Sequence, residues 1–598
     1  MSIKNESQLD ILRHSAAHVL AAAVLEMFPE AKFAIGPNIE DGFYYDFDLP
    51  RTLIPEDLAL LEEKMRAIIE QDFEFAKSEV DAKEAVKLFK KANQTYKVEL
   101  IEDLMASTSS ANNYSLSEAP VESKGRVTLY KSGHFVDLCR GPHIASTGKI
   151  KPDAFKLLKT SGAYWRGSEK NKMLQRIYGA AWESKKDLAA YLNKLEEAAK
   201  RDHRKIGKEQ DLFSFHDVAP GMPFFHPKGT IIYTLLKNFW VEAQQEFKYE
   251  NILCPSMLDV AIWKKSGHWD HYKDDMYFIK AGEDEKEYAL RPMDCPGAIL
   301  IYNNSLHSYR ELPLRYAEPG LITRKEKSGQ LNGLLRVQQF VQDDAHIFLT
   351  EEQIEQEVKS VINLVNKMYE PFGMKYKAYL STRPDDYMGD IKSWEKAESA
   401  LKNILDEIYG ADNYGLKEKD GAFYGPKIDY QLEDAIGRTW QCATIQLDFQ
   451  MPEKFGCRYI DNEGKEQRPV MIHRTILGSF ERFMGILIEH FAGAWPVWLA
   501  PEQAWILPIS EKHAEYAESV AQKLRNANIR AAVKDESDTI GKKIRAGEQQ
   551  KIPYLLVVGD KEIAIDSVAV RQRGKRDLGA MPVEKLVEKI TKEICDKS

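Results

Sequence analysis

Cations and acids are separated within one short segment of the chain, residues 315–348. Four cations flank two turn-forming pairs, Ser328-Gly329 and Asn332-Gly333, and two carboxylates and a histidine follow. Such a pocket could hold a polyphosphate at one end and an ammonium or a metal at the other. The same pattern is typical of a solvated charged hairpin, so spacing alone leaves both interpretations open. The cations are Arg324, Lys325, Lys327 and Arg336, and the second group is Asp343, Asp344 and His346.

A second group of residues has the spacing of metal ligands. His14 and His18 lie four residues apart in a stretch rich in helix formers, so they share a helical face. The sequence CRGPH places Cys139 and His143 four residues apart as well. HxxxH with CxxxH has the form of a four-ligand zinc site, but HxxxH by itself is a weak signal. Metal binding and a role without a metal both remain open.

The elements that must position these residues suggest a multidomain α+β chain. We expect a mixed α/β module over 1–183, with a Ser/Asn-rich surface loop at 106–125. Residues 184–210 are highly charged with Leu and Ala at helical spacing, which predicts an exposed connecting helix. A large sheet domain is expected over 211–497, and alternating strands and amphipathic helices predict a small α/β domain with a parallel or mixed sheet over 498–598.

The composition limits the class of protein. The chain has 598 residues, 43% hydrophobic and 29% charged, which is typical of a globular protein of several domains. No apolar run approaches the ~20 residues that span a bilayer, and the N-terminus lacks the apolar core of a signal peptide, so we expect a cytoplasmic chain without membrane insertion. Six scattered cysteines predict reduced thiols, and the net charge of −9 requires any RNA contact to come from local basic patches.

Several motifs together carry a resemblance to a known family. Arg324, Glu326, Arg336 and Phe340 resemble motif 2 of the class II aminoacyl-tRNA synthetases, and GSFER resembles motif 3. RPMDCPG, VQDDAHIF, GAFYGPKIDY, WQCATIQLDF and MIHRTILGS are similar, more closely, to the threonyl-tRNA synthetase family, from about residue 10 to the C-terminus. The resemblance implies an antiparallel-sheet catalytic domain flanked by an N-terminal editing domain and a C-terminal anticodon-binding domain.

The resemblance also implies how ATP is bound. Arg324 would contact the α-phosphate and Arg336 the γ-phosphate, while Phe340 and Arg482 would enclose the adenine, and Mg²⁺ would accompany the ATP. Guanidinium forks match phosphate oxygens, and a ring with a guanidinium plane can hold a base. The implied catalytic residues are Arg324, Arg336, Arg482 and Gln342, and the implied ATP contacts are Glu326, Phe340, Gln441, Thr444 and Ser479.

A zinc ion in the catalytic domain is the third implication. Taken singly, Cys295, His346 and His473 look like an ordinary buried cysteine and ordinary core histidines. The resemblance makes them the ligands of one Zn²⁺ per subunit, with coordination left open for the amino and hydroxyl groups of threonine. A site that must bind a hydroxyl rejects valine, which lacks one, by on the order of 10⁴. The implied threonine contacts are Met293, Gln342, Asp344, Tyr424 and Gln446.

Serine would pass this selection, because it lacks only a methyl group, worth ~1 to 3 kcal/mol. The resemblance therefore implies hydrolytic editing of Ser-tRNA(Thr) in the first domain, in a pocket that generally works without zinc. A His-bound water would attack the seryl ester. The implied editing residues are His14, His18, Lys97, Asp137, Cys139 and His143, and the implied anticodon contacts are Glu562 and Arg571.

The remaining implications concern partners. The substrates would be L-threonine, ATP and tRNA(Thr), and residues 251–278 would correspond to motif 1, which predicts a homodimer. The small ubiquitin-like domain that usually opens bacterial members is expected to be absent. Four positions depart from the usual pattern: Ala298, Asn332, Gln338 and Ala443.

Three other functions compete with this one. A proline or serine synthetase does not account for Cys295, His346 and His473 together with the HxxxH and CxxxH module. A non-catalytic tRNA-binding relative is disfavoured because Arg324, Arg336 and Arg482 are retained. A free-standing metal hydrolase would explain only the first third of the chain.

Overall fold

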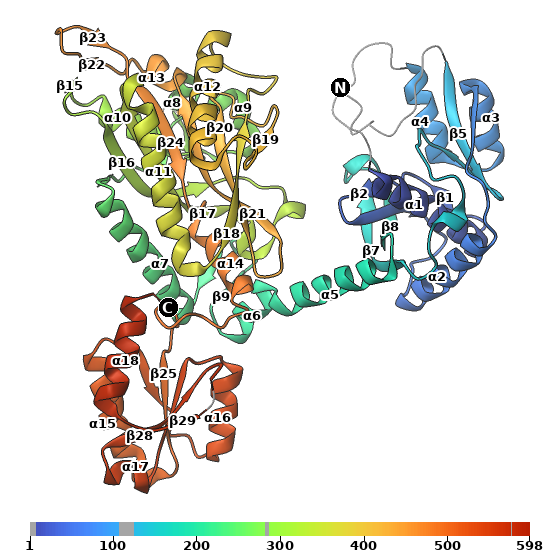
Figure 1. The fold of residues 1–598 in the computed structure, drawn as a ribbon. Helices are drawn as coiled ribbons and strands as arrows, with labels where there is room; N and C mark the ends of the chain where they lie inside the picture. The colour runs from blue at the N-terminus through green and yellow to red at the C-terminus, as the bar shows by residue number, and fades with distance from the viewer. Residues whose placement is uncertain (1–6, 107–124, 282–285, 576, 598) are drawn as a thin grey trace. The chain divides into compact units, whose positions relative to one another are not determined.

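The structure is a computed structural model that describes residues 7–106, 125–281, 286–575 and 577–597 (Figure 1). It divides into two compact units, Met1–Glu196 and Glu197–Ser598, which are described separately. The expected surface loop at 106–125 lies outside the described residues except at its two ends. Within the described residues, every helix is too short or too polar to span a bilayer.

The first unit packs helices against two antiparallel sheets. One sheet has the order β1-β3-β8-β7 with β2 paired to β3, and the other has the order β4-β5-β6. Ser7 and Asp10 form a capping box that starts α1, whose apolar face packs on β3 and α2. The bounds are α1 Gln8–Met27, β1 Lys32–Phe33, β2 Asn38–Ile39, β3 Gly42–Asp48, α2 Pro55–Glu70, β4 Ala76–Asp81, α3 Ala82–Lys91, α4 Thr95–Ala106, β5 Arg126–Ser132, β6 Phe135–Leu138, β7 Phe155–Tyr164 and β8 Met173–Ala181.

The connecting segment contains two helices where the sequence pattern predicts one. These are α5 (Lys185–Arg201) and α6 (His203–Glu209). Asp202 interrupts the run, because its carboxylate accepts a hydrogen bond from the backbone N–H of Arg204 at 2.8 Å and caps the second helix.

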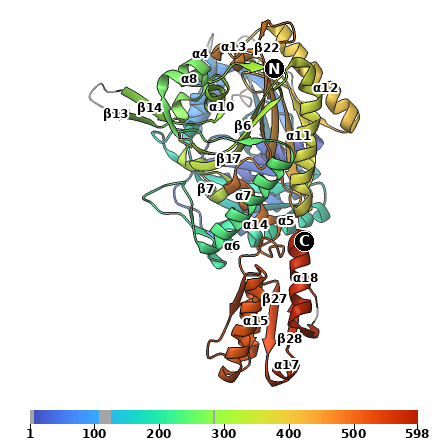
Figure 2. The ribbon, with the colours of Figure 1, turned by 90° about the vertical axis from the view of Figure 1, so that its left-hand side faces the viewer.

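An eight-stranded sheet organises the middle of the second unit, in the order β11-β16-β17-β24-β21-β20-β18-β19. All neighbours are antiparallel except β11 with β16 and β18 with β19. Helices α11 and α12 lie side by side next to this sheet in Figures 1 and 2, and their apolar faces join its core. The segment 315–348 is therefore a hairpin of two long core strands, β16 and β17, with the cationic loop between them.

The elements of this part of the unit have the following bounds. They are β9 Phe213–Ser214, β10 Phe224–Phe225, α7 Pro227–Glu246, β11 Glu250–Asn251, β12 Met257–Asp259, α8 Val260–Ser266, α9 His268–Tyr272, β13 Phe278–Ala281, β14 Lys286–Leu290, α10 Cys295–Tyr302, β15 His307–Ser308, β16 Leu314–Thr323, β17 Gln339–Leu349, α11 Ile354–Tyr369, β18 Lys375–Ser381, α12 Ile391–Tyr409, β19 Gly415–Lys417, β20 Lys427–Glu433, β21 Thr439–Asp448, α13 Gln450–Phe455, β22 Tyr459–Ile460, β23 Glu466–Gln467, β24 Val470–Thr475 and α14 Phe480–His490.

The C-terminal part has the mixed sheet that the alternating pattern predicts. The order is β26-β25-β27-β28-β29, with β26, β25 and β27 parallel and the last two strands antiparallel. The pattern missed β29 and the short α17. The bounds are β25 Ala504–Pro508, α15 Ala514–Asn526, β26 Ala531–Val533, α16 Ile540–Gln549, β27 Tyr554–Val558, α17 Asp560–Ala564, β28 Ser567–Gln572, β29 Asp577–Pro582 and α18 Val583–Cys595.

Two glycines at helix starts should respond oppositely to alanine. A Cβ at Gly229 in α7 would overlap the carbonyl of Leu212, whereas a Cβ at Gly541 in α16 meets no atom within 4 Å. We expect Gly229→Ala to destabilise the domain of the eight-stranded sheet by about 1 to 3 kcal/mol and Gly541→Ala to stabilise the C-terminal domain by about 0.5 to 1 kcal/mol. Calorimetric unfolding would measure both, and an unchanged Gly229→Ala transition would contradict the close approach.

Candidate functional site

The register of three strands aligns the residues of one predicted pocket. His346 on β17 lies opposite His473 on β24, and His473 lies opposite Gln446 on β21. Residues that pair directly across strands project from the same face of a sheet. Gln342 and Asp344 share the face of His346, because they lie four and two residues before it, respectively, on the same strand. The sheet therefore collects side chains from three distant segments on one face.

Cys295, His346 and His473 form the buried group that the motifs predict as zinc ligands. Their possible ligand atoms all lie within 4.8 Å of one another. Cys295 is the first residue of α10, and the Nε2 atom of His473 lies 2.8 Å from an oxygen of Asp448. A carboxylate on one ring nitrogen orients a histidine and leaves the other nitrogen as the ligand.

The chemistry of this group fits a zinc ion. Burial raises the pKa of the Cys295 thiol well above its usual range and lowers the pKa of His346 well below its own. A bound cation reverses the cost of a buried thiolate. One sulfur and two imidazole nitrogens are a donor set that zinc accepts, with coordination left open for substrate groups.

The predicted threonine contacts line the same face. Gln342 donates a hydrogen bond to Asp344 at 3.0 Å, and the Tyr424 hydroxyl donates to Gln446 at 2.5 Å. Burial and the neighbouring Asp343 raise the pKa of Asp344 to about 7. A buried carboxyl in this state gains stability from an ammonium ion placed beside it.

The Met293 sulfur lies 3.0 Å from Nε2 of His268, a buried histidine that the motifs did not single out. The same nitrogen is 3.7 Å from the Cys295 sulfur. Burial lowers the pKa of His268 to about 3, so its ring is neutral at pH 7. HxxH spacing in GHWDH is the one signal in the sequence that could have drawn attention to it.

The predicted phosphate-binding arginines lie at both ends of the hairpin loop. The Arg324 Nε donates to the Pro292 carbonyl at 3.1 Å and its guanidinium lies 5.4 Å from the centre of the Phe340 ring. Arg336 pairs with Glu326 at 2.7 Å. Among the described residues, the buried Nε of Arg482 has no hydrogen-bond partner, which is the state of a donor that awaits a ligand.

Two aspartates that the motifs did not assign hold the elements of the predicted ATP site in place. One Asp429 oxygen accepts hydrogen bonds from Gln441 at 2.8 Å and from Thr444 at 2.9 Å. Asp343 accepts from the backbone N–H groups of residues 476, 477 and 478, at 2.9 to 3.0 Å. Asp343 thus fixes the loop that leads into α14, where Ser479 caps the helix and the backbone N–H of Arg482 donates to its hydroxyl at 3.1 Å.

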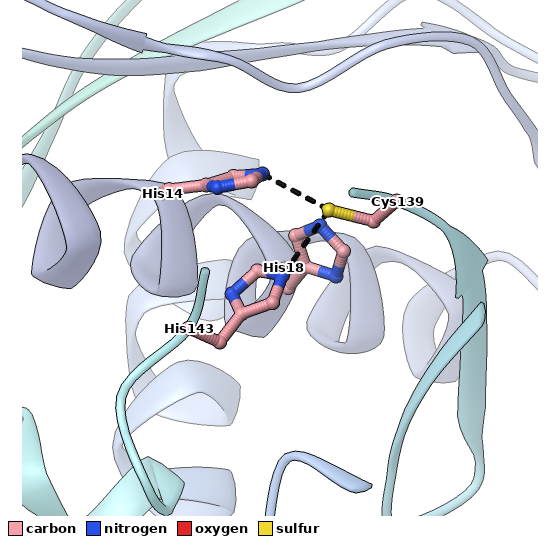
Figure 3. A group of neighbouring side chains, drawn as sticks. All are labelled: His14, His18, Cys139 and His143. Carbon is pink, nitrogen blue, oxygen red and sulfur yellow. Dashed lines mark hydrogen bonds between the residues drawn. The ribbon is translucent and has the colours of Figure 1, made fainter. Parts of the chain in front are cut away.

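The first unit holds the second group, at the point where α1 faces the end of β6. The Cys139 sulfur lies 3.3 Å from Nε2 of His14 and 3.3 Å from Nε2 of His143 (Figure 3). His18 lies one helical turn after His14, with its ring centre 4.3 Å from that of His143. The four possible ligand atoms lie within 4.8 Å of one another, so the structure brings these four residues together.

A charged pair adjoins this cluster. The Lys97 ammonium lies 2.5 Å from Asp137, and the Tyr45 hydroxyl donates to the same carboxylate at 2.6 Å. His18 Nε2 is 3.7 Å from Asp137. Burial lowers the pKa of His14 to about 4, so its imidazole is neutral and can accept a proton at pH 7. Tyr45 is a further residue that the motifs did not identify.

The two predicted anticodon residues contact different partners in the C-terminal domain. Glu562 accepts from the backbone N–H of Gly559 at 3.0 Å in α17, whereas Arg571 on β28 lies 3.8 Å from Glu548. Arg573, two residues further, donates to the carbonyls of Lys551 and Trp495 and so anchors the strand.

The four unusual positions are all accommodated locally. Gln338 is buried, accepts a hydrogen bond from the Tyr277 hydroxyl and, through its backbone, donates to Gly221 at 2.7 Å. Ala298 and Ala443 are fully buried, and Asn332 forms a bridge with Arg336.

A further hydrogen-bonded group links an aspartate, a histidine and a serine in the order found in a hydrolytic triad. His226 joins Asp211 at 2.6 Å through Nδ1 and Ser214 at 2.9 Å through Nε2. The Asp211 side chain is 69% exposed, and His216 also contacts the Ser214 hydroxyl at 2.9 Å. Water competes for the exposed carboxylate, and a second histidine shares the hydroxyl. We therefore interpret these hydrogen bonds as stabilising the β9–β10 hairpin.

Three family models match separate parts of the chain. The model described as tRNA synthetase class II core domain (G, H, P, S and T) matches residues 277–491. The anticodon binding domain model matches residues 503–593. The model described as threonyl and alanyl tRNA synthetase second additional domain matches residues 127–178, which include Asp137, Cys139 and His143.

Individual relatives agree with these matches. The chain is 51% identical over 596 residues to a protein named threonine–tRNA ligase from Carboxydothermus hydrogenoformans, covering 100% of this chain and 90% of the relative. The solved RNA binding domain of threonyl-tRNA synthetase from Cryptosporidium parvum Iowa II is 40% identical with a TM-score of 0.63, covering 66% of this chain and 98% of that one. Putative threonyl-tRNA synthetase ThrRS-1 from Aeropyrum pernix is 28% identical with a TM-score of 0.59, covering 66% and 97%.

Proposed function

This chain belongs to the threonyl-tRNA synthetase family, and from this premise we propose how its own residues join threonine to tRNA(Thr) and remove serine attached in error. The observation that supports the proposal most is the convergence of Cys295, His346 and His473 within 4.8 Å, on the sheet face that also carries Asp344. A class II core, an anticodon-binding domain and a second additional domain supply the three parts that such an enzyme needs.

Threonine would be recognised by the buried face of β17, β21 and β24. When zinc is bound by Cys295, His346 and His473, it supplies a Lewis acid that amino and hydroxyl groups can coordinate. The Asp344 carboxyl, whose pKa burial raises to about 7, would become fully charged beside the threonine ammonium. Tyr424 and Gln446, already hydrogen-bonded to each other, would bind the remaining polar end, and Met293 would cover it.

Activation of threonine would depend on positioning and charge. The threonine carboxylate attacks the α-phosphorus of Mg²⁺-ATP, the bond to the β-phosphate oxygen breaks, and pyrophosphate leaves. Arg324 would leave the Pro292 carbonyl for the α-phosphate, and Arg336 would exchange Glu326 for the γ-phosphate. Phe340 and Arg482 would enclose the adenine, while Gln441 and Thr444, held by Asp429, and Ser479 would complete the ATP contacts.

Editing would occur in the histidine and cysteine cluster of the first unit. His14, neutral at pH 7, would accept a proton from the water that attacks the seryl ester carbonyl, and the tRNA ribose oxygen would leave. The Lys97–Asp137 pair would stabilise developing charge and orient His18. Cys139 and His143 would shape the pocket, and no metal is needed for these steps.

The partners follow from the same premise. Glu562 and Arg571 would contact unstacked anticodon bases. A homodimer is expected because large apolar side chains of the motif 1 region and β16 are exposed, among them Leu253 at 85%, Met257 at 43% and Leu321 at 39%. We expect the enzyme to act in the cytoplasm, where charged tRNA supplies translation.

Removing one proposed zinc ligand should separate metal binding from folding. Cys295→Ala should lose its zinc and lower threonine-dependent pyrophosphate exchange by on the order of 100-fold or more. Cys457→Ala removes a cysteine that is equally buried in the same apolar cluster and should keep both. Zinc analysis and exchange with threonine, serine, valine and proline would be measured on the same samples. Full zinc and normal threonine exchange in Cys295→Ala would refute the assignment.

The pH dependence of Ser-tRNA(Thr) hydrolysis should report the buried histidine. Because burial lowers the pKa of His14 from 6.5 to about 4, the neutral base persists as the pH falls, and the enzymatic rate should stay level from pH 8 to pH 5.5. His14→Ala should lower that rate by about 100-fold or more. His134→Ala, in an exposed turn of the same unit, is the matched control. An inflection near pH 6.5, or full activity in His14→Ala, would contradict the account.

A further inference from the structure

His203 joins two segments that carry the proposed ATP-binding arginines. It is the first residue of α6 and is 1% exposed. Its Nε2 atom lies 3.0 Å from the backbone nitrogen of Leu334, in the short helix η6 (Gly333–Leu335) that directly precedes Arg336. Its Nδ1 atom lies 2.6 Å from Glu489, at the last turn of α14.

The two contacts fix the direction of both hydrogen bonds. A backbone N–H can only donate, so Nε2 of His203 is the acceptor and carries no proton. The proton therefore lies on Nδ1 and is donated to Glu489. The same carboxylate oxygen also accepts the backbone N–H of His203 at 3.1 Å, so the ring and its main chain are held together.

A metal is a poor occupant of this position, although Asp202, His203 and Glu489 could geometrically surround one. Arg204 binds Asp202 at 2.6 Å and Arg438 binds Glu489 at 2.5 Å. Two guanidinium groups repel a cation, and Nδ1 of His203, the nitrogen that faces both carboxylates, already carries the proton donated to Glu489. The imidazole therefore acts as a neutral bridge between protein groups.

The loop is shaped to accept this bridge. Gly333 has φ +50°, and a Cβ at this position would overlap Nε2 of His203. Leu334 and Leu335 are buried beneath the loop, and a Cβ on Gly485 of α14 would approach Leu334 Cβ to 3.2 Å. The loop end is thus seated on the helix that carries Arg482.

We propose that His203 is a positioning residue for ATP, which holds the end of the cationic loop on α14 so that Arg336 and Arg482 face the same nucleotide. This inference rests on the proposed roles of those two arginines. It assigns no contact between His203 and the substrate. His203 acts through the Leu334 N–H, which would otherwise be a buried donor without a partner.

Three variants of the full chain test the two hydrogen bonds of the His203 ring separately. In His203→Gln the side-chain oxygen can reach the position of Nε2 and accept from Leu334, whereas in His203→Asn the amide reaches only Glu489. His203→Ala loses both contacts. In threonine-dependent pyrophosphate exchange, His203→Asn and His203→Ala should raise the KM for ATP about tenfold, with the KM for threonine unchanged, and His203→Gln should stay within about threefold of the parent.

A second variant and a second measurement distinguish the loss of the His203 contacts from misfolding of the protein. Gly333→Ala would place a Cβ against Nε2 of His203, displace the same loop and raise the KM for ATP by a similar factor. Hydrolysis of Ser-tRNA(Thr) should be unchanged in every variant. An Asn variant that matches the Gln variant, or equal losses for ATP and threonine that follow the melting temperature, would overturn the proposal.

Arg336→Ala distinguishes the inference from the function on which it rests. If Arg336→Ala leaves the KM for ATP unchanged, the proposed ATP site is wrong. If Arg336→Ala raises that KM while His203→Asn does not, the ATP site stands and the role of His203 is wrong.

Discussion

The pairing of β17 with β24, with His346 opposite His473, is the constraint on which the proposed catalytic site depends. Side chains alternate between the faces of a strand, so a slip of one residue would turn His346, Asp344 and Gln342 to the opposite face together. Both strands are buried inside the eight-stranded sheet, and their apolar residues pack in its core, which specifies this register strongly. Cys295 and Asp448 are then supplied by α10 and by the end of β21.

Burial lowers histidine pKa values in both pockets. Desolvation keeps one histidine neutral in each pocket, since it lowers the pKa of His14 to about 4 and that of His346 well below its usual range. The acids differ. Asp344 has its pKa raised to about 7, whereas Asp137 lies against the Lys97 ammonium. The first arrangement is suited to a substrate that brings a positive charge, and the second to a reaction that develops negative charge.

The sequence predicted the parts of this structure that depend on local pattern or short motifs. Periodicity or turn residues predict three such parts: the hairpin of 315–348, the helix with His14 and His18, and the alternating C-terminal domain. Asp202 broke the expected connecting helix because capping competes with helix continuation at a single residue. Strand β29 was missed because its Gly579 and its exposed residues hide the alternation of a strand.

The residues that sequence reasoning missed in the sites are mostly buried partners from distant segments. Asp448 meets His473 across 25 positions, Asp343 meets the 476–478 loop across more than 130, and His203 meets Leu334 across 131. A single buried carboxylate or imidazole has no periodicity of its own, so only the folded sheet reveals its partner.

In the proposed site the strand register gathers one sulfur and two imidazoles around a zinc ion that selects threonine. X-ray absorption at the zinc edge of the purified full-length chain tests it most directly. The account predicts one sulfur at about 2.3 Å and two nitrogens at about 2.0 to 2.1 Å. Two further light-atom ligands should appear when threonine is added and not when valine is added. A metal shell without sulfur, or a shell that responds equally to valine, would contradict it.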